Sequence, residues 1–399
     1  MDGADPVLRR RRAIALAAAG AAALAAAAVV LLVTAGGTPR RGASTATAPP
    51  GPPVQPAPSG AEQFGASVNR LFNDRTYGPA QIDSQLRELQ QTGAAVARSD
   101  ALWEATEPTA PVDGVHHYDW SFDDLIAGSL AAHGLRWLPI IDYSPAWAQS
   151  VAGHDHSPPS VPGDYAAYAG ALAARYGPGG GFWREHPNLT AEPVDTFEIW
   201  NEPDNPAFWS PAPDPSAYDE LYLLARDAIT AAQPGARVIV GGLTKPALFL
   251  PAMLAARPDM RGHLDGVAIH PYGPTPETVL ARVHTARGAL TSLGLGAVPL
   301  YVTEFGWTTH PTGALDWAPA RLRTGYISRT TAALGHLDCG LAMAILYTWV
   351  TPERDLANAQ DWFGINPPAG GGSADTAAFA AGLHDATSPG ARISLCPPG

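Results

Sequence analysis

The sequence predicts a (β/α)8 barrel, an α/β fold, behind an N-terminal hydrophobic segment and a proline-rich linker. From about residue 61 onward, short apolar runs alternate with amphipathic helical segments, which is the pattern of a parallel sheet covered by helices. Two of these runs, far apart in the chain, each end close to a glutamate, where such folds carry their chemistry. The eight predicted strands are residues 64–69, 94–99, 137–142, 196–200, 237–241, 266–270, 300–304 and 343–348.

Helical segments are predicted between these strands. Thr275-Pro276-Glu277 is a typical helix start, because threonine caps the first amides, proline fits the first turn and an acidic side chain complements the helix dipole. The longest loops are expected after the third and eighth strands, and in a barrel such loops border the active site. The other predicted helices are residues 81–91, 164–176, 218–232, 318–334 and 376–386.

Residues 1–35 have the pattern of a signal peptide or a membrane anchor. Arg9 to Arg12 precede an uncharged stretch at residues 13–35. At about 1.5 Å per helical residue this stretch is long enough to cross a bilayer core of about 30 Å. Small-residue cleavage sites follow it, so an uncleaved anchor and a cleaved signal both fit. In either case the arginines keep the N-terminus in the cytoplasm and the rest of the chain is expected to be extracytoplasmic.

The chain after this segment has two parts. Residues 36–60 form a proline- and alanine-rich linker without apolar periodicity, which predicts an extended spacer. Residues 61–399 are long enough for one barrel domain with insertions. The formal net charge of -12 argues against a nucleic-acid partner, because such partners require a basic surface.

The two cysteines, Cys339 and Cys396, are candidates for a disulfide. Outside the cytoplasm they can pair, which would fasten the C-terminus to the bottom of the barrel. The alternative is two separate buried thiols. Two cysteines alone are not expected to hold a metal, and His154 and His156, in a loop rich in glycine and proline, lack a visible third ligand.

Glu202 and Glu304 are the candidate catalytic residues. Glu202 follows the predicted strand 196–200 and precedes Pro203, which cannot extend a strand, whereas Glu304 is the last residue of its own predicted strand. A retaining glycosidase needs two carboxyl groups at one site, because one attacks the sugar and the other moves protons. A lone glutamate before proline is more often part of a surface turn, but the pairing on two apolar strands favours catalysis.

Several motifs at the predicted strand ends form one pattern: Trp200-Asn201-Glu202-Pro203, Thr303-Glu304-Phe305-Gly306, residues 93–98 with Trp103 and Glu107-Pro108, Tyr118-Asp119-Trp120 and Pro145-Ala146-Trp147. This pattern resembles clan A glycoside hydrolases over nearly all of residues 61–350. Within the clan it is closest to family 39, which includes β-xylosidases and exopolysaccharide hydrolases, with family 5 next. The resemblance implies that Glu202 is the acid/base and Glu304 the nucleophile. Asp204 departs from the family 39 pattern, in which asparagine is common at this position.

The same resemblance implies two polar partners for the glutamates. Asn201 is expected to hydrogen-bond the 2-hydroxyl of the sugar, a contact that strengthens in the transition state. Arg98, at the end of the second strand, is expected to hold Glu304 ionised through a charged hydrogen bond. A plain interstrand salt bridge is the alternative for Arg98.

Further residues are expected around the sugar. His270 and Tyr272 follow the sixth strand, where the clan places groups near the nucleophile or the sugar hydroxyls, although a lone histidine is often structural. Trp349, after the eighth strand, resembles the clan's sugar platform, and packing at the barrel rim is the alternative. Trp147 is a further sugar-binding candidate, weaker than these.

The predicted function is therefore that of a retaining glycoside hydrolase, which cleaves O-glycosidic bonds of a polysaccharide or glycoside through two glutamates. Its partner is a carbohydrate, the mechanism requires no cofactor and no metal, and an uncleaved N-terminal segment would tether it to a membrane. A transglycosylase would use the same glutamates with a sugar acceptor. A non-catalytic barrel that binds cell-envelope glycan is the other alternative, but binding alone does not require such a pair.

Overall fold

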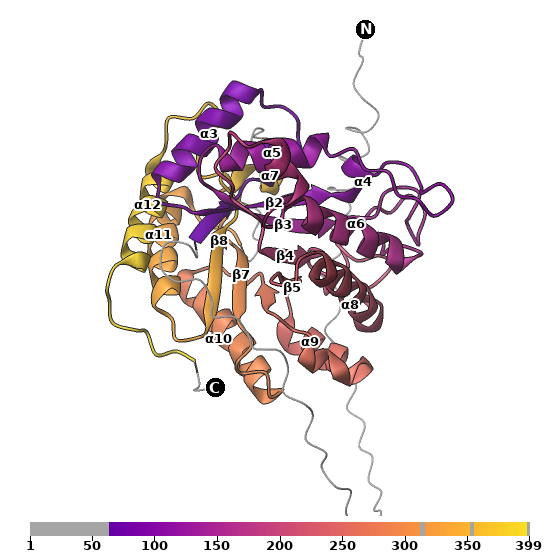
Figure 1. The fold of residues 1–399 in the computed structure, drawn as a ribbon. Coiled ribbons are helices and arrows are strands. Elements are labelled where there is room, and N and C mark those ends of the chain that lie inside the picture. The colour runs from indigo at the N-terminus through magenta and orange to yellow at the C-terminus, as the bar shows by residue number, and fades with distance from the viewer. Residues whose placement is uncertain (1–63, 312–315, 352–354, 397–399) are drawn as a thin grey trace, which may run out of the picture. The chain divides into compact units, whose positions relative to one another are not determined.

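The computed structural model describes residues 64–311, 316–351 and 355–396. Eight parallel strands follow one another around a closed barrel, in which β8 pairs with β1. Helices surround the strands (Figure 1), and the predicted (β/α)8 barrel is confirmed. The strands are β1 (Phe64–Ser67), β2 (Val96–Leu102), β3 (Arg136–Asp142), β4 (Thr196–Ile199), β5 (Arg237–Leu243), β6 (Val267–Ile269), β7 (Leu300–Phe305) and β8 (Leu341–Leu346).

All eight predicted strands are present, and each differs from its predicted range by up to three residues at one end or at both. β2 continues to Leu102, because this residue still pairs with Asp142 at the end of β3. β8 begins earlier than expected, at Leu341, which pairs with Leu300 of β7. Apolar runs locate a strand, whereas its ends depend on the length of the neighbouring strand.

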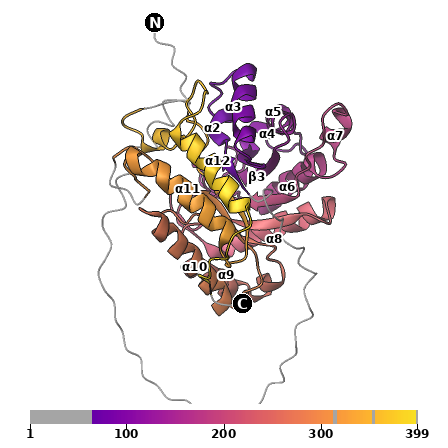
Figure 2. The ribbon, with the colours of Figure 1, turned by 90° about the vertical axis from the view of Figure 1, so that its left-hand side faces the viewer.

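The predicted helices are also present. Four of them begin earlier than predicted. Three of these begin at a proline, Pro79, Pro162 and Pro215, because proline is well suited to the first turn of a helix. α11 and α12 lie side by side (Figure 2). The helices are α2 (Asn69–Phe72), α3 (Pro79–Gln91), α4 (Trp103–Thr106), α5 (Ser121–Ala131), α6 (Pro162–Tyr176), α7 (Gly181–Glu185), α8 (Pro215–Ala232), α9 (Pro246–Ala256), α10 (Pro276–Ser292), α11 (Ala320–His336) and α12 (Ala374–Thr387), with 3-10 turns η2 (Pro258–Gly262) and η3 (Ala359–Trp362).

The barrel interior is apolar at one end and charged at the other. Toward the N-terminal ends of the strands, Val96, Leu138, Ile239 and Tyr301 belong to one buried cluster. Successive side chains of a strand point to opposite faces, so Arg98 shares the inner face of β2 with Val96 but lies nearer the C-terminal end. The charged side chains are therefore stacked above the apolar layer, at the mouth of the barrel.

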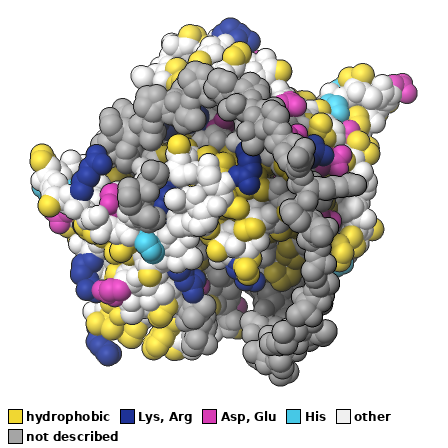
Figure 3. Space-filling view, turned by 90° about the horizontal axis from the view of Figure 1, so that it is seen from below, with side chains coloured by type: hydrophobic (Ala, Val, Ile, Leu, Met, Phe, Trp, Pro, Cys, Tyr) yellow, Lys and Arg dark blue, Asp and Glu magenta, His cyan; other side chains and the backbone are white. Residues whose placement is uncertain are grey.

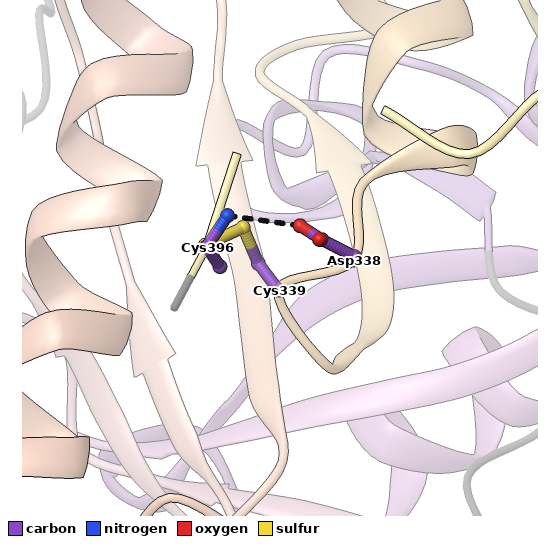
Figure 4. A group of neighbouring side chains, drawn as sticks. All are labelled: Asp338, Cys339 and Cys396. Carbon is purple, nitrogen blue, oxygen red and sulfur yellow. Dashed lines mark hydrogen bonds between the residues drawn. A yellow bond between two sulfur atoms is a disulfide. The ribbon is translucent and has the colours of Figure 1, made fainter. Parts of the chain in front are cut away.

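Cys339 and Cys396 form a disulfide just before β8 (Figure 4). The side chain of Asp338 lies beside it, and its Oδ1 accepts a hydrogen bond from the backbone N–H of Cys396 at 2.9 Å. Both contacts fasten the last described residues to the N-terminal end of the barrel strands. These three side chains bring metal-ligating atom types together, but a disulfide sulfur is not the thiolate that binds metals.

The surface of the described residues carries charges of both signs. Figure 3 shows acidic and basic side chains scattered over the described part of one face, between apolar and uncharged groups. Within the described ranges, no helix combines the length and the apolar character needed to span a bilayer. The predicted hydrophobic segment at residues 1–35 and the linker at 36–60 lie outside the described residues.

We predict that removing the disulfide destabilises the barrel without unfolding it. The two cysteines are 57 residues apart, and closing a loop of that length stabilises the folded chain by about 2–4 kcal/mol. The double variant Cys339→Ala, Cys396→Ala should therefore melt at a lower temperature than the oxidised wild type in calorimetry. Reductant should lower the melting temperature of the wild type but not that of the variant. Equal melting temperatures for variant and oxidised wild type would contradict the stabilising role.

Candidate active site

The centre of the barrel mouth is the fully buried guanidinium of Arg98 on β2. Its Nε donates to Glu198 Oε2 at 2.7 Å, and its Nη1 donates to Glu304 Oε1 at 2.6 Å. Its Nη2 donates to Glu198 Oε1 and to Asn201 Oδ1, both at 3.1 Å. One arginine thus joins β2, β4 and β7 across the barrel. Both alternatives predicted for Arg98 are present, a salt bridge between strands and a contact with Glu304.

Glu198 is a functional residue that the sequence analysis missed. It lies inside β4 and is fully buried. Besides Arg98, it accepts hydrogen bonds at Oε1 from the Gly242 N–H at 2.9 Å and from the Thr303 hydroxyl at 3.0 Å. The absence of a side chain at Gly242 also leaves room for His270, because a Cβ there would lie 1.9 Å from His270 Nε2. A charged residue in the middle of an apolar strand was the signal that could have revealed Glu198.

The loop after β4 carries Glu202 through an unusual backbone path. β4 ends at Ile199, earlier than predicted, because Trp200 adopts a left-handed φ of 65°. Glu202 is also left-handed, with a φ of 46°, so it stands on the loop rather than at the strand tip. Non-glycine residues rarely adopt this conformation, and it is concentrated at functional sites.

Two polar side chains of the same loop hold Glu202 in place. The Asn205 amide donates to Glu202 Oε2 at 2.6 Å. Asp204 accepts hydrogen bonds at Oδ1 from the backbone N–H of Thr244 at 3.0 Å and at Oδ2 from that of Lys245, which ties the loop to the end of β5. Asp204, which departs from the family 39 pattern, therefore has a structural role, because it binds two backbone amides after β5.

His270, directly after β6, lies between the two glutamates. The Thr303 hydroxyl donates to Glu198, so its oxygen accepts from His270 Nε2 at 3.1 Å. Nε2 therefore carries a hydrogen, and Nδ1 faces Glu202 Oε1 at 2.7 Å. Burial lowers the pKa of His270, but Glu304 and Glu202 outweigh it and the net pKa is raised. A proton can pass between Nδ1 and Glu202 along this short contact.

Glu304 on β7 is held in its ionised form. Burial raises the pKa of Glu304, but His270, Arg98 and Tyr272 together lower it below the ordinary value. The Tyr272 hydroxyl donates to Glu304 Oε2 at 2.6 Å, and His270 Nδ1 lies 3.6 Å from the same oxygen.

Ligating atoms of Glu202, His270 and Glu304 all lie within 4.8 Å of one another. Such a set could hold a divalent cation, but the Arg98 charge against Glu304 opposes one, and hydrogen bonding already explains the geometry.

The two predicted tryptophans, Trp349 and Trp147, take part in packing. Trp349 is fully buried in the hydrophobic core, so it presents no open ring face and the rim-packing alternative holds rather than the sugar platform. Trp147 packs edge-on against Trp103 at 5.3 Å, and its Nε1 donates to the Glu107 carbonyl at 2.9 Å. His156, which was considered as a metal ligand, contacts the Ala207 carbonyl through Nδ1 at 2.7 Å.

Scans against protein-family models and curated proteins find no match. Solved structures do match the barrel. A β-xylosidase from Caulobacter crescentus is 21% identical, with a TM-score of 0.62 over 82% of this chain and 69% of that one. A family 39 enzyme from Xanthomonas axonopodis pv. citri is 19% identical, with a TM-score of 0.61 over 81% and 67%.

The chain has the fold of these glycoside hydrolases. A family 5 enzyme of subfamily 18 from Bifidobacterium longum subsp. infantis also matches, at 12% identity and a TM-score of 0.57 over 83% of this chain and 80% of that one. The resemblance to families 39 and 5 that the motifs predict is therefore confirmed for the fold.

We predict that Tyr272→Phe shifts the acidic limb of the pH–activity profile. The Tyr272 hydroxyl stabilises the charged form of Glu304 and lowers its pKa. Loss of this hydrogen bond should raise that pKa, so kcat/KM should begin to fall at a higher pH. Tyr347→Phe is the matched control, because the Tyr347 hydroxyl bonds Gln360 instead. An unmoved limb in Tyr272→Phe, or an equal shift in both variants, would refute this role.

Proposed function

We propose that this protein is a retaining glycoside hydrolase, which cleaves O-glycosidic bonds of a polysaccharide or glycoside. One observation carries the proposal: oxygens of Glu202 and Glu304 approach within 4.8 Å at the barrel mouth. Retaining enzymes hold their carboxyl groups about 5–5.5 Å apart, whereas inverting enzymes need about 6.5–9.5 Å to admit a water. The short separation supports retention.

In the first step, Glu304 is the nucleophile. The positive charge of Arg98 helps to keep it ionised, and Arg98 and Tyr272 fix its two oxygens. The carboxylate attacks the anomeric carbon and forms a glycosyl ester as the glycosidic bond breaks. Glu202 gives its proton to the departing oxygen. In the second step Glu202 takes a proton from water, and the hydroxide releases the sugar from Glu304.

His270 supplies the contact that lets Glu202 change roles. Its Nδ1 is 2.7 Å from Glu202, whereas Thr303 holds Nε2. Imidazole can therefore share the proton that Glu202 loses and regains in the two steps. We assign Asn201, which Arg98 orients through Oδ1, to the 2-hydroxyl of the reacting sugar. The xylosidase and family 39 neighbours support a carbohydrate substrate for this site.

We infer an extracytoplasmic location for the catalytic domain. The disulfide between Cys339 and Cys396 supports it, because structural disulfides persist in oxidising compartments. The hydrophobic segment at residues 13–35 behind four arginines also supports it, whether that segment stays as an anchor or is cleaved.

The experiment that tests the function is hydrolysis of aryl glycosides by Glu202→Gln and Glu304→Ala. Loss of the acid/base should lower kcat by about 10²–10⁴-fold, and loss of the nucleophile should remove turnover, while both variants keep the wild-type melting temperature within a few degrees. Glu220→Gln, an exposed glutamate on α8, is the control. Wild-type rates in either active-site variant would contradict the catalytic roles assigned to Glu202 and Glu304.

A further inference from the structure

Two buried carboxyl groups at the barrel mouth have no part in the proposed mechanism. Asp100 on β2 and Asp142 at the end of β3 are 9% and 1% exposed. Asp100 shares the inner face of β2 with Arg98, since side chains alternate along a strand. Asp142 shares the inner face of β3 with Leu138, a member of the interior cluster. Both side chains therefore lie above Arg98, on the side of the barrel where the two glutamates stand.

The hydrogen bonding of this acid pair is incomplete. Asp100 Oδ2 accepts from the Asn73 amide, whereas Asp142 Oδ1 is buried with no hydrogen-bond partner. Most buried polar atoms are paired, so an unpaired carboxyl oxygen in a site calls for a ligand or water. The charges of Arg98 and Glu198 act on both acids, so the pair is electrostatically coupled to the residues of the active site.

The pair is suited to hydroxyl groups. Burial raises the pKa of Asp100 to about 6, and burial followed by the charge of Asp100 raises the pKa of Asp142 well above its ordinary value. Both shifts favour the protonated, uncharged form of these carboxyls. A carboxyl with a proton donates, and a carboxylate accepts. A sugar hydroxyl does both, so a pair of neighbouring ring hydroxyls matches this combination.

We propose that Asp100 and Asp142 form a recognition subsite for the ring hydroxyls of an uncharged sugar unit beside the bond that is cleaved. The subsite deepens the proposed function and rests on it. An acidic sugar such as a uronate does not fit, because its carboxylate would meet the negative charges of this pair. Arg98 already bonds Glu198 and Glu304, and His270 already contacts Glu202. These two side chains therefore do not offset the negative charge of a sugar carboxylate.

The test compares neutral and acidic 4-nitrophenyl glycosides on four enzymes. The substrates are the β-D-xyloside, β-D-glucoside, β-D-mannoside and β-D-glucuronide, with mono-deoxy analogues of the best neutral one. The enzymes are the wild type, Asp142→Ala, Asp142→Asn and the control Asp123→Asn. Asp123 is an equally buried acid on α5 with its pKa raised to about 7, but it bonds Thr106 behind the barrel wall.

Asp142→Ala should lower kcat/KM on the best neutral substrate by about 10–100-fold, mainly through KM, because a charged or strong hydrogen bond to substrate is lost. The control should stay within about twofold of the wild type. With the deoxy analogue that lacks the contacted hydroxyl, Asp142→Ala should lower kcat/KM by less than about threefold. The contact is then already absent in the wild type, so the substitution removes nothing further. The glucuronide should be cleaved more slowly than the glucoside. If Asp142→Ala fails to fold, Asp142→Asn provides the same readout with the shape preserved.

Three results would overturn the subsite: a kcat/KM for the Asp142 variant equal to the control, a penalty that is the same on every deoxy analogue, or a glucuronide cleaved as fast as the glucoside. Failure of the wild type to cleave any of the glycosides would instead refute the proposed function. Calorimetric titration of the same compounds into the wild type and Asp142→Ala then tests the subsite independently of turnover. Binding that Asp142→Ala weakens supports it, and equal binding or none refutes it.

Discussion

The buried charge of Arg98 is the constraint on which the mouth of the barrel depends. A guanidinium without solvent contact must be matched by anions, and removing either partner would leave an uncompensated charge, at a cost of about 3–5 kcal/mol. Glu198 and Glu304 supply that match from strands that do not adjoin β2. The nucleophile is therefore ionised and oriented by the same contact that joins the strands, so structure and reactivity share one interaction.

The rest of the site follows from how this charge is distributed. Glu198, saturated with donors, serves as a fixed anion below the reaction centre, and through Thr303 it determines which nitrogen of His270 carries hydrogen. His270 can then exchange a proton only through Nδ1, which faces Glu202. The acid/base is thus controlled by a chain of hydrogen bonds that leaves β4 at Glu198 and returns to the loop after β4 through β7 and the end of β6. Enzymes use such preorganisation to stabilise developing charge.

Much of this arrangement was predictable from the sequence, because apolar strands of a barrel carry their functional residues at one end. That rule predicts Glu202 and Glu304 as the catalytic pair, whereas the contact of Arg98 with Glu304 is predicted by the resemblance to clan A. Glu198 was missed because its role depends on a register that pairs it with Arg98 across the barrel. Local sequence could not choose between a rim-packing and a sugar-facing Trp349, since exposure of an aromatic ring depends on which loops cover it.

The most direct test of the account is the anomeric configuration of the first-formed product, followed by proton NMR as the wild-type enzyme cleaves an aryl glycoside. A double displacement through Glu304 predicts that the released sugar first appears with the configuration of the substrate and mutarotates afterwards. Initial appearance of the opposite anomer would contradict the roles assigned to both glutamates, because it requires direct attack by water.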